Sequence, residues 1–85
     1  MYIVYLERGA EKDLRKLPHH LLPRIREILL GLKTTPRPPG THKLEGSRHD
    51  WRIRVGDYRI LYEIDDDERT VKVYRIKHRR EVYRF

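Results

Sequence analysis

The chain has 85 residues, of which 20 are Lys or Arg, 13 are Asp or Glu and none is Cys, so its formal net charge at pH 7 is +7. A chain of this length forms one small domain, which we expect to span residues 1–85, and its positive charge indicates a polyanionic partner such as nucleic acid, the ribosome or an acidic protein. The lack of Cys excludes disulfides, thiolate zinc sites and Cys nucleophiles, and the lack of a long apolar run or a signal-peptide pattern predicts a cytoplasmic protein without a membrane partner.

Residues 2–6 open the chain with aromatic and β-branched side chains, which predict a strand buried on both faces or nearly so. Good helix formers follow from Gly9 to Leu17, and Pro18 ends that helix. A second helix is predicted between His20 and Lys33, where the leucines and isoleucines form a wide apolar stripe. The Pro-rich residues 34–41 then form an irregular connection.

Residues 51–64 have the clearest pattern in the chain, an alternation of apolar and cationic side chains around a turn at Gly56 and Asp57. This predicts a hairpin with Arg54 opposite Arg59. One face is then apolar and consists of Trp51, Ile53, Val55, Tyr58, Ile60, Tyr62 and Ile64. The other face consists of Arg52, Arg54, Arg59, Leu61 and Glu63.

Residues 42–45 are expected to form a short strand before this hairpin, and residues 46–50 a loop. After the hairpin, an acidic turn at 65–69 leads to a strand over 70–77, whose apolar residues do not alternate clearly enough to assign its faces. The predicted fold is α+β, with an N-terminal strand and a two-helix hairpin packed on one face of a small, mainly antiparallel sheet.

The cationic hairpin face is the first candidate site. Like charges directly opposite each other are unfavourable, so Arg54 against Arg59 predicts an anion above them. Arg52 lies on the same face, and Arg79 joins it if the last strand lies beside the hairpin. Phosphate is the expected anion, because a guanidinium binds it through two hydrogen bonds and keeps its charge.

Three further side chains could transfer protons near these arginines. Tyr83 could stack on a base or exchange a proton, unless its ring simply packs at the end of the sheet. Glu63 is predicted to form an ion pair that moderates the Arg cluster, with a general-base role as the alternative. His78, which adjoins Arg79, is a better candidate than His49, and the histidine spacing predicts no metal site.

A family resemblance rests on several segments: Leu14-Arg15-Lys16-Leu17-Pro18, Lys43-Leu44-Glu45-Gly46, the hairpin 51–64, and His78-Arg79-Arg80-Glu81-Val82-Tyr83-Arg84. With the opening strand, they resemble the RelE/ParE superfamily of toxins from bacterial and archaeal toxin–antitoxin systems, and within it the RelE-like mRNA endonucleases. The resemblance covers nearly the whole chain and implies a RelE-like fold.

The resemblance also implies an activity, which is cleavage of mRNA in the ribosomal A site by attack of the ribose 2′-OH on the adjacent phosphate, without metal or cofactor. It implies an RNA-binding surface of Arg52, Arg54, Arg59, Lys77, Arg79 and Arg80. Where family members have Lys at the basic pair, this chain has Arg52 and Arg54, which are poor bases. Proton transfer is therefore expected from Tyr83, His78 or Glu63.

Finally, the resemblance implies three partners: the ribosome, mRNA and a RelB-like antitoxin, a partly disordered chain that covers the cationic face. Two alternatives share the fold. One is a ParE-like inhibitor of DNA gyrase, which acts by protein contact and leaves the Arg cluster unexplained. The other is a non-catalytic RNA or ribosome binder, in which only the phosphate contacts remain.

Overall fold

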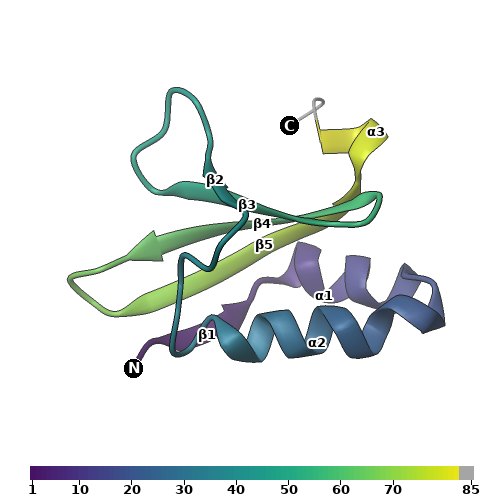
Figure 1. The fold of residues 1–85 in the computed structure, drawn as a ribbon, viewed down its shortest axis with the longest axis horizontal. Coiled ribbons are helices and arrows are strands. Elements are labelled where there is room, and N and C mark those ends of the chain that lie inside the picture. The colour runs from purple at the N-terminus through teal and green to yellow at the C-terminus, as the bar shows by residue number, and fades with distance from the viewer. Residues whose placement is uncertain (83–85) are drawn as a thin grey trace.

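A five-stranded sheet and two longer helices form the two layers of the protein in the computed structural model, which describes residues 1–82 (Figure 1). The strands are β1 (Ile3–Leu6), β2 (Thr41–Lys43), β3 (Asp50–Val55), β4 (Tyr58–Asp65) and β5 (Thr70–His78). The helices are α1 (Arg8–Lys16), a 3-10 turn η1 (His19–Leu21), α2 (Leu22–Gly31) and the short α3 (Arg79–Val82).

The order of the strands across the sheet is β1-β5-β4-β3-β2. β1 runs parallel to β5, and every other neighbouring pair is antiparallel. Helices α1 and α2 both lie on one side of the sheet, and α3 lies at the far end of β5 (Figure 1). The predicted α+β fold with a helix pair on one face of a mainly antiparallel sheet is confirmed.

The β3–β4 hairpin has the predicted register, with Arg54 opposite Arg59 and Val55 opposite Tyr58. Gly56 has φ +57, a conformation that glycine adopts without steric cost, which explains why the chain turns at this position. The apolar face predicted for this hairpin packs against the helices and contributes Ile53, Val55, Ile60, Tyr62 and Ile64 to the core. The opposite face of the sheet is not covered by α1 or α2 (Figure 1).

β1 differs from its prediction. Ile3 and Tyr5 are 58% and 48% exposed, whereas Val4 and Leu6 pack against the core. The prediction of burial on both faces is wrong because β1 is an edge strand and the helices cover only one side of the sheet.

β5 contains an irregularity that the sequence pattern does not reveal. Tyr62 pairs with Val73 but its neighbour Leu61 pairs with Arg75, so Tyr74 is an extra residue in the ladder. Val71 and Val73 before the bulge, and Ile76 after it, are all buried in the core. The bulge explains why the apolar residues of this strand do not alternate.

At the end of the sheet away from α3, the irregular connection after α2 is tied to the sheet. Arg37 Nη2 lies 2.8 Å from Asp66 Oδ2, and Tyr2 donates its hydroxyl to Asp66 Oδ1 at 2.6 Å. The Arg37 guanidinium also stacks on Trp51, 4.8 Å from the ring centroid.

None of the helices in residues 1–82 is long and apolar enough to cross a membrane.

Candidate nucleic-acid interface

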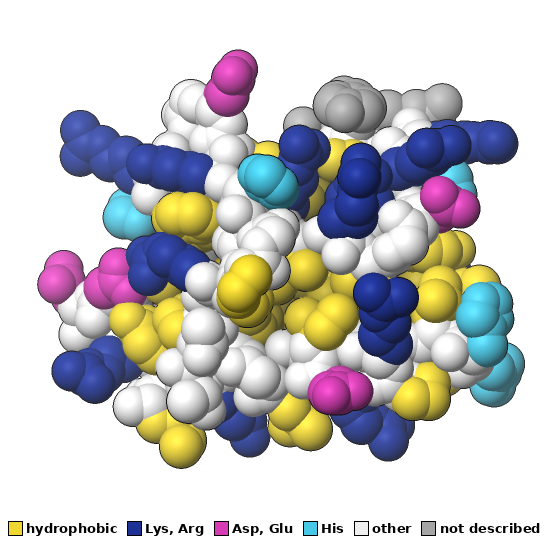
Figure 2. All heavy atoms as spheres, in the orientation of Figure 1, with side chains coloured by type: hydrophobic (Ala, Val, Ile, Leu, Met, Phe, Trp, Pro, Cys, Tyr) yellow, Lys and Arg dark blue, Asp and Glu magenta, His cyan; other side chains and the backbone are white. Residues whose placement is uncertain are grey.

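The open face of the sheet carries a cationic hollow of about 390 Å³. It is lined by Pro39, Gly40, His42, Arg52, Ile53, Arg54 and Arg59, so no acidic residue of the described chain lines it. Lys and Arg side chains project along the upper part of the molecule, on both sides of the space between the β2–β3 loop and α3 (Figure 2). The structure thus brings together three of the predicted phosphate-binding arginines.

Arg54 and Arg59 differ in their surroundings although they are cross-strand partners. Arg54 is exposed, whereas Arg59 is only 8% exposed, and its Nη1 donates to the carbonyl oxygens of Gly56 at 3.0 Å and Tyr58 at 2.9 Å. The two side chains therefore do not simply repel each other across the face. Arg59 has a structural purpose, which is to hold the hairpin turn, so repulsion between the pair is a weaker argument for a bound anion than the sequence suggested.

A second hollow, of about 720 Å³, lies beside the first and shares Arg52 and His42 with it. Its lining residues come from β2, the β2–β3 loop, the middle of the sheet and α3, and they include Leu61, Tyr74 and Val82. Apolar and aromatic side chains thus adjoin Arg52 there, although the acidic residues Glu45 and Asp50 also line this hollow. An aromatic and apolar surface beside a cationic hollow suits a nucleotide, whose base is flat and weakly polar and whose phosphate is charged.

Tyr74 is a residue of this second hollow that the sequence analysis missed. Burial and the neighbouring carboxylate of Asp50 raise the pKa of its phenol, which keeps it protonated and able to donate a hydrogen bond. Asp50 also accepts a hydrogen bond from the Ser47 hydroxyl. The signal for Tyr74 could not be read from the strand pattern, because the bulge decides which way this residue faces.

Glu63 lies toward the other end of β4, where its cross-strand neighbours are Asp50 and Lys72. It is exposed and lines a different hollow from the one that holds Arg54 and Arg59. Within residues 1–82 no ion pair joins Glu63 to Arg52, so the predicted moderating pair does not form.

His78 does not join the arginines on the open face. It is the cross-strand partner of Tyr58, on the helix-facing side of the sheet, and the two rings meet edge to face with centroids 5.4 Å apart. Its Nδ1 accepts a hydrogen bond from the backbone amide of Arg80 at 3.2 Å, so the ring caps the start of α3. His42 is instead the histidine on the open face, because it pairs with Arg52 and lines both hollows.

The last strand does lie beside the hairpin, but Arg79 and Arg80 begin α3, and Arg79 does not line the hollow that holds Arg52, Arg54 and Arg59. The β4–β5 ladder ends at His78 opposite Tyr58, and the Arg79 amide instead donates to the Asp57 carbonyl of the hairpin turn at 2.7 Å. The Arg79 side chain is exposed and forms a 3.7 Å ion pair with Asp57. Tyr83 lies outside the described residues.

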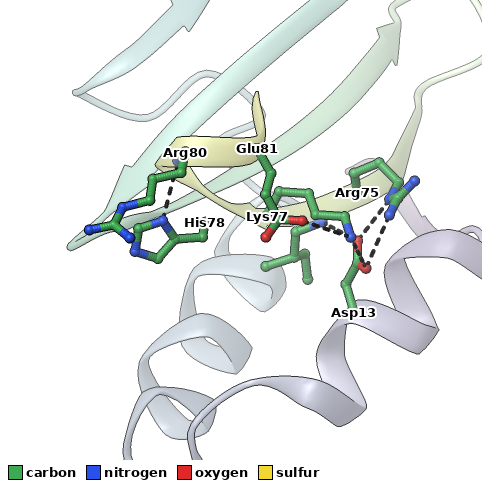
Figure 3. Close-up of polar contacts among 7 residues, drawn as sticks. Asp13, Arg75, Lys77, His78, Arg80 and Glu81 are labelled. Atoms are coloured by element: carbon green, nitrogen blue, oxygen red, sulfur yellow. Dashed lines mark hydrogen bonds and ion pairs between the residues drawn. The ribbon is translucent and has the colours of Figure 1, made fainter. Parts of the chain in front are cut away.

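Lys77, predicted to bind RNA, is the cross-strand partner of Arg59, but its side chain reaches toward α1. Its Nζ lies 3.2 Å from Asp13 Oδ1 and 3.7 Å from Glu81 Oε2 (Figure 3). Burial raises the pKa of the Asp13 carboxyl, but hydrogen bonds from Arg75, the Ile76 amide and Lys77 outweigh burial and hold this pKa below its ordinary value.

Within residues 1–82, no group of three His, Asp or Glu side chains could hold a metal ion.

The sequence matches a known protein family and is similar to known toxins. Residues 4–83 match the family described as the ParE toxin of the type II toxin–antitoxin system parDE. The chain is 36% identical to toxin RelG of Mycobacterium tuberculosis over 98% of its own length and 97% of that protein. It is 31% identical to the putative toxin RelE1 of Methanocaldococcus jannaschii over 95% of its own length and 93% of that protein.

Among solved structures, the fold is similar to the archaeal RelE–RelB complex from Pyrococcus horikoshii OT3. The TM-score is 0.82 and the sequence identity is 30%, over 92% of this chain and 94% of the matched chain.

Proposed function

Because the chain belongs to the ParE toxin family of type II toxin–antitoxin systems and is RelE-like, we propose that it is a ribosome-dependent endoribonuclease that inhibits translation. It cuts mRNA in the A site by attack of a ribose 2′-OH on the adjacent phosphate. The observation that carries this proposal is the hollow that Arg52, Arg54 and Arg59 line without any acidic residue of the described chain. Such a site suits a phosphodiester whose negative charge increases in the transition state.

In this proposal, Arg52 and Arg54 bind the scissile phosphate, and Arg59 adds positive charge while it holds the hairpin turn. Arg79 and Arg80 bind neighbouring phosphates from α3, where both are exposed. Lys77 contributes its charge to this surface, although its ammonium group is already paired with carboxylates. The arginines keep their charge at every physiological pH, so they bind the phosphodiester anion and take no part in proton transfer.

The reaction needs a base for the 2′-OH and an acid for the leaving oxygen. The 2′ oxygen bonds to phosphorus, the bond to the 5′ oxygen breaks, and a cyclic phosphate and a 5′-hydroxyl result. We assign the base role to His42, since it lies beside Arg52 on the open face. Tyr83 remains our candidate for donating the proton to the leaving oxygen, whereas His78 caps α3 on the helix side of the sheet and Glu63 lines a different hollow from the arginines.

The proposed partners are the ribosome, mRNA and a RelB-like antitoxin, in the cytoplasm. The Pyrococcus relative was solved as a RelE–RelB complex, which supports an antitoxin here. The net charge of +7 favours an acidic, partly disordered antitoxin segment that covers the cationic face.

The test is to incubate the purified protein with programmed ribosomes and to map the 5′ ends of the message. We expect A-site cuts with the wild type and a loss of cutting when Arg52 and Arg54 are both replaced by Gln. Arg24→Gln and Arg26→Gln together form the matched control, because both side chains are exposed on α2, on the helix side of the sheet. Absence of A-site cuts by the wild type would refute the proposal.

Two other functions give different results in the same assay. A ParE-like inhibitor of DNA gyrase, which the name of the matching family favours, leaves the message intact and produces gyrase-dependent DNA breaks. A non-catalytic binder also leaves the message intact, but its affinity for ribosomes falls steeply with salt.

A further inference from the structure

Helix α1 continues the edge of the sheet where β1 stops. The β1–β5 ladder ends with Leu6 opposite Val73, and the Glu7 amide makes the last bond to the Val73 carbonyl at 2.8 Å. Beyond this point α1 packs directly against β5. A Cβ at Gly9 would lie 3.0 Å from both the Tyr74 carbonyl oxygen and Arg75 Cδ, so only glycine permits this approach without a shift.

Asp13 lies one turn after Gly9 and supplies the acceptor that β1 no longer provides. Its Oδ2 accepts hydrogen bonds from the Ile76 amide at 2.9 Å and from Arg75 Nε at 2.9 Å. Asp13 is only 6% exposed, and the buried residues on either side of it are Ala10 in the same helix and Leu17, which directly follows the helix. An apolar residue here would leave the buried Ile76 amide without this partner, which explains a carboxylate in an otherwise apolar stripe.

The second carboxylate oxygen extends the contact to α3. Asp13 Oδ1 lies 3.2 Å from Lys77 Nζ, and the same ammonium group lies 3.7 Å from Glu81 Oε2 (Figure 3). The Lys77 side chain is 17% exposed, so solvent screens the Asp13–Lys77 pair less than an ion pair on the surface. A chain of charges therefore runs from α1 through the end of β5 to α3.

We propose that Asp13 is a positioning residue of the candidate site, which acts through Lys77 and Glu81 to fix the orientation of α3. This helix carries Arg79 and Arg80, and it is also attached to the hairpin turn through the Arg79 amide and side chain, which both contact Asp57. Asp13 itself is on the helix side of β5 and does not line either hollow of the open face. The consequence for catalysis rests on the proposed function, whereas the consequence for α3 does not.

The test compares Asp13→Asn with Glu11→Gln. Asn keeps the size and one acceptor oxygen, but it loses the charge and places an amide N–H group near Arg75 or Lys77. Glu11→Gln removes the same charge from an exposed position of the same helix, where Glu11 forms an ion pair with Arg15 at 3.9 Å. Amide NMR shifts and hydrogen exchange of residues 76–82 report on α3 without any need for activity.

We expect Asp13→Asn to shift the amide signals of Arg79 to Val82 and to speed hydrogen exchange at the Arg79 amide. We also expect it to lower the kcat of message cleavage by about 10- to 100-fold, because a small displacement of positioned groups slows the reaction strongly. The KM for ribosomes stays nearly unchanged, and Glu11→Gln changes none of these quantities. Unchanged amide signals in folded Asp13→Asn would overturn the proposal. Shifted amide signals with an unchanged kcat would overturn its catalytic part.

Glu81→Gln is the second variant, since Glu81 is half-exposed and its replacement does not open the core. If Asp13 acts through Lys77 on Glu81, the effects of Asp13→Asn and Glu81→Gln on the α3 signals are not additive in the double variant. Additive effects would overturn the proposed route. A wild type that does not cut the message refutes only the proposed function, because the amide measurements still decide whether Asp13 positions α3.

Discussion

Arg54 and Arg59 are directly opposite each other in the β3–β4 hairpin, yet Arg54 extends to solvent while Arg59 folds back onto the carbonyl oxygens of its own turn. Two arginines in equivalent positions of one hairpin thus have different tasks. Arg54 is available to a ligand, and Arg59 stabilises the turn that positions Arg54.

Arg54→Gln should therefore weaken binding of ribosomes or RNA and reduce the dependence of binding on salt, with little effect on stability, because an exposed cation that contacts phosphate contributes mainly to binding. Arg59→Gln should lower the free energy of unfolding by about 1 to 3 kcal/mol, since it removes hydrogen bonds from a nearly buried group. Filter binding across a salt series and urea unfolding separate the two effects. Equal loss of stability in both variants would contradict this division of roles.

Gly9→Ala should destabilise the protein by roughly 1 to 3 kcal/mol, because the added methyl group meets the Tyr74 carbonyl and forces α1 away from β5. Gly31→Ala is the matched control, since Gly31 also lies in a helix, but the added Cβ would meet no atom of residues 1–82 within 4 Å apart from its chain neighbours and its own helix backbone. The control should raise stability by about 0.4 to 1 kcal/mol through a less flexible unfolded chain. Thermal or urea unfolding of both variants measures the contrast, and a stabilised Gly9→Ala would show that α1 does not approach β5 this closely.

The pH dependence of stability should reveal the Asp13 contacts. The pKa of Asp13 is lowered in the folded state, so the contacts stabilise the protein above the pKa of the unfolded chain and are lost as pH falls through the folded pKa. The free energy of unfolding of the wild type should exceed that of Asp13→Asn by a constant amount above about pH 5, and the difference should shrink below about pH 4. Urea unfolding from pH 3 to 7 measures this difference. A difference that does not change with pH would mean that the charge of Asp13 contributes nothing.

His42→Gln and His78→Gln should affect cleavage differently. If His42 is the base, its replacement lowers the rate constant of cleavage by about 100-fold or more and leaves the amide signals of α3 unchanged. His78→Gln should alter the amide signals of α3 and reduce cleavage less, because His78 Nδ1 caps the Arg80 amide. Single-turnover cleavage, together with amide spectra, distinguishes the two variants. A larger loss of cleavage in His78→Gln than in His42→Gln would assign proton transfer to His78.

The hairpin could be predicted to the residue because two independent signals agree there, the alternation of side chains and the Gly56-Asp57 turn. β5 could not be resolved in the same way, since a bulge at Tyr74 interrupts its alternation and only the pairing with β4 reveals it. β1 has a typical core composition, but its exposure depends on its place at the edge of the sheet, which composition does not encode.

The candidate site was predictable only in part, for a related reason. Arg52 and Arg54 follow directly from the alternation within one hairpin. His42 reaches the site through its pairing with Arg52, a contact between segments whose register the sequence did not fix. Asp13 did leave a signal, because this carboxylate lies between the buried apolar residues Ala10 of α1 and Leu17, which follows α1.

The carboxylate of Asp13 has a consequence for self-association. An unpaired strand edge can recruit a strand from another chain, and the outer edge of β5 beyond β1 would be such an edge. There the Ile76 amide already donates its hydrogen bond to Asp13, and the Arg75 and Lys77 side chains contact the same carboxylate across this edge. An incoming strand would have to displace a buried charge network, so the sheet is protected from edge-to-edge aggregation at the end that carries its cationic face.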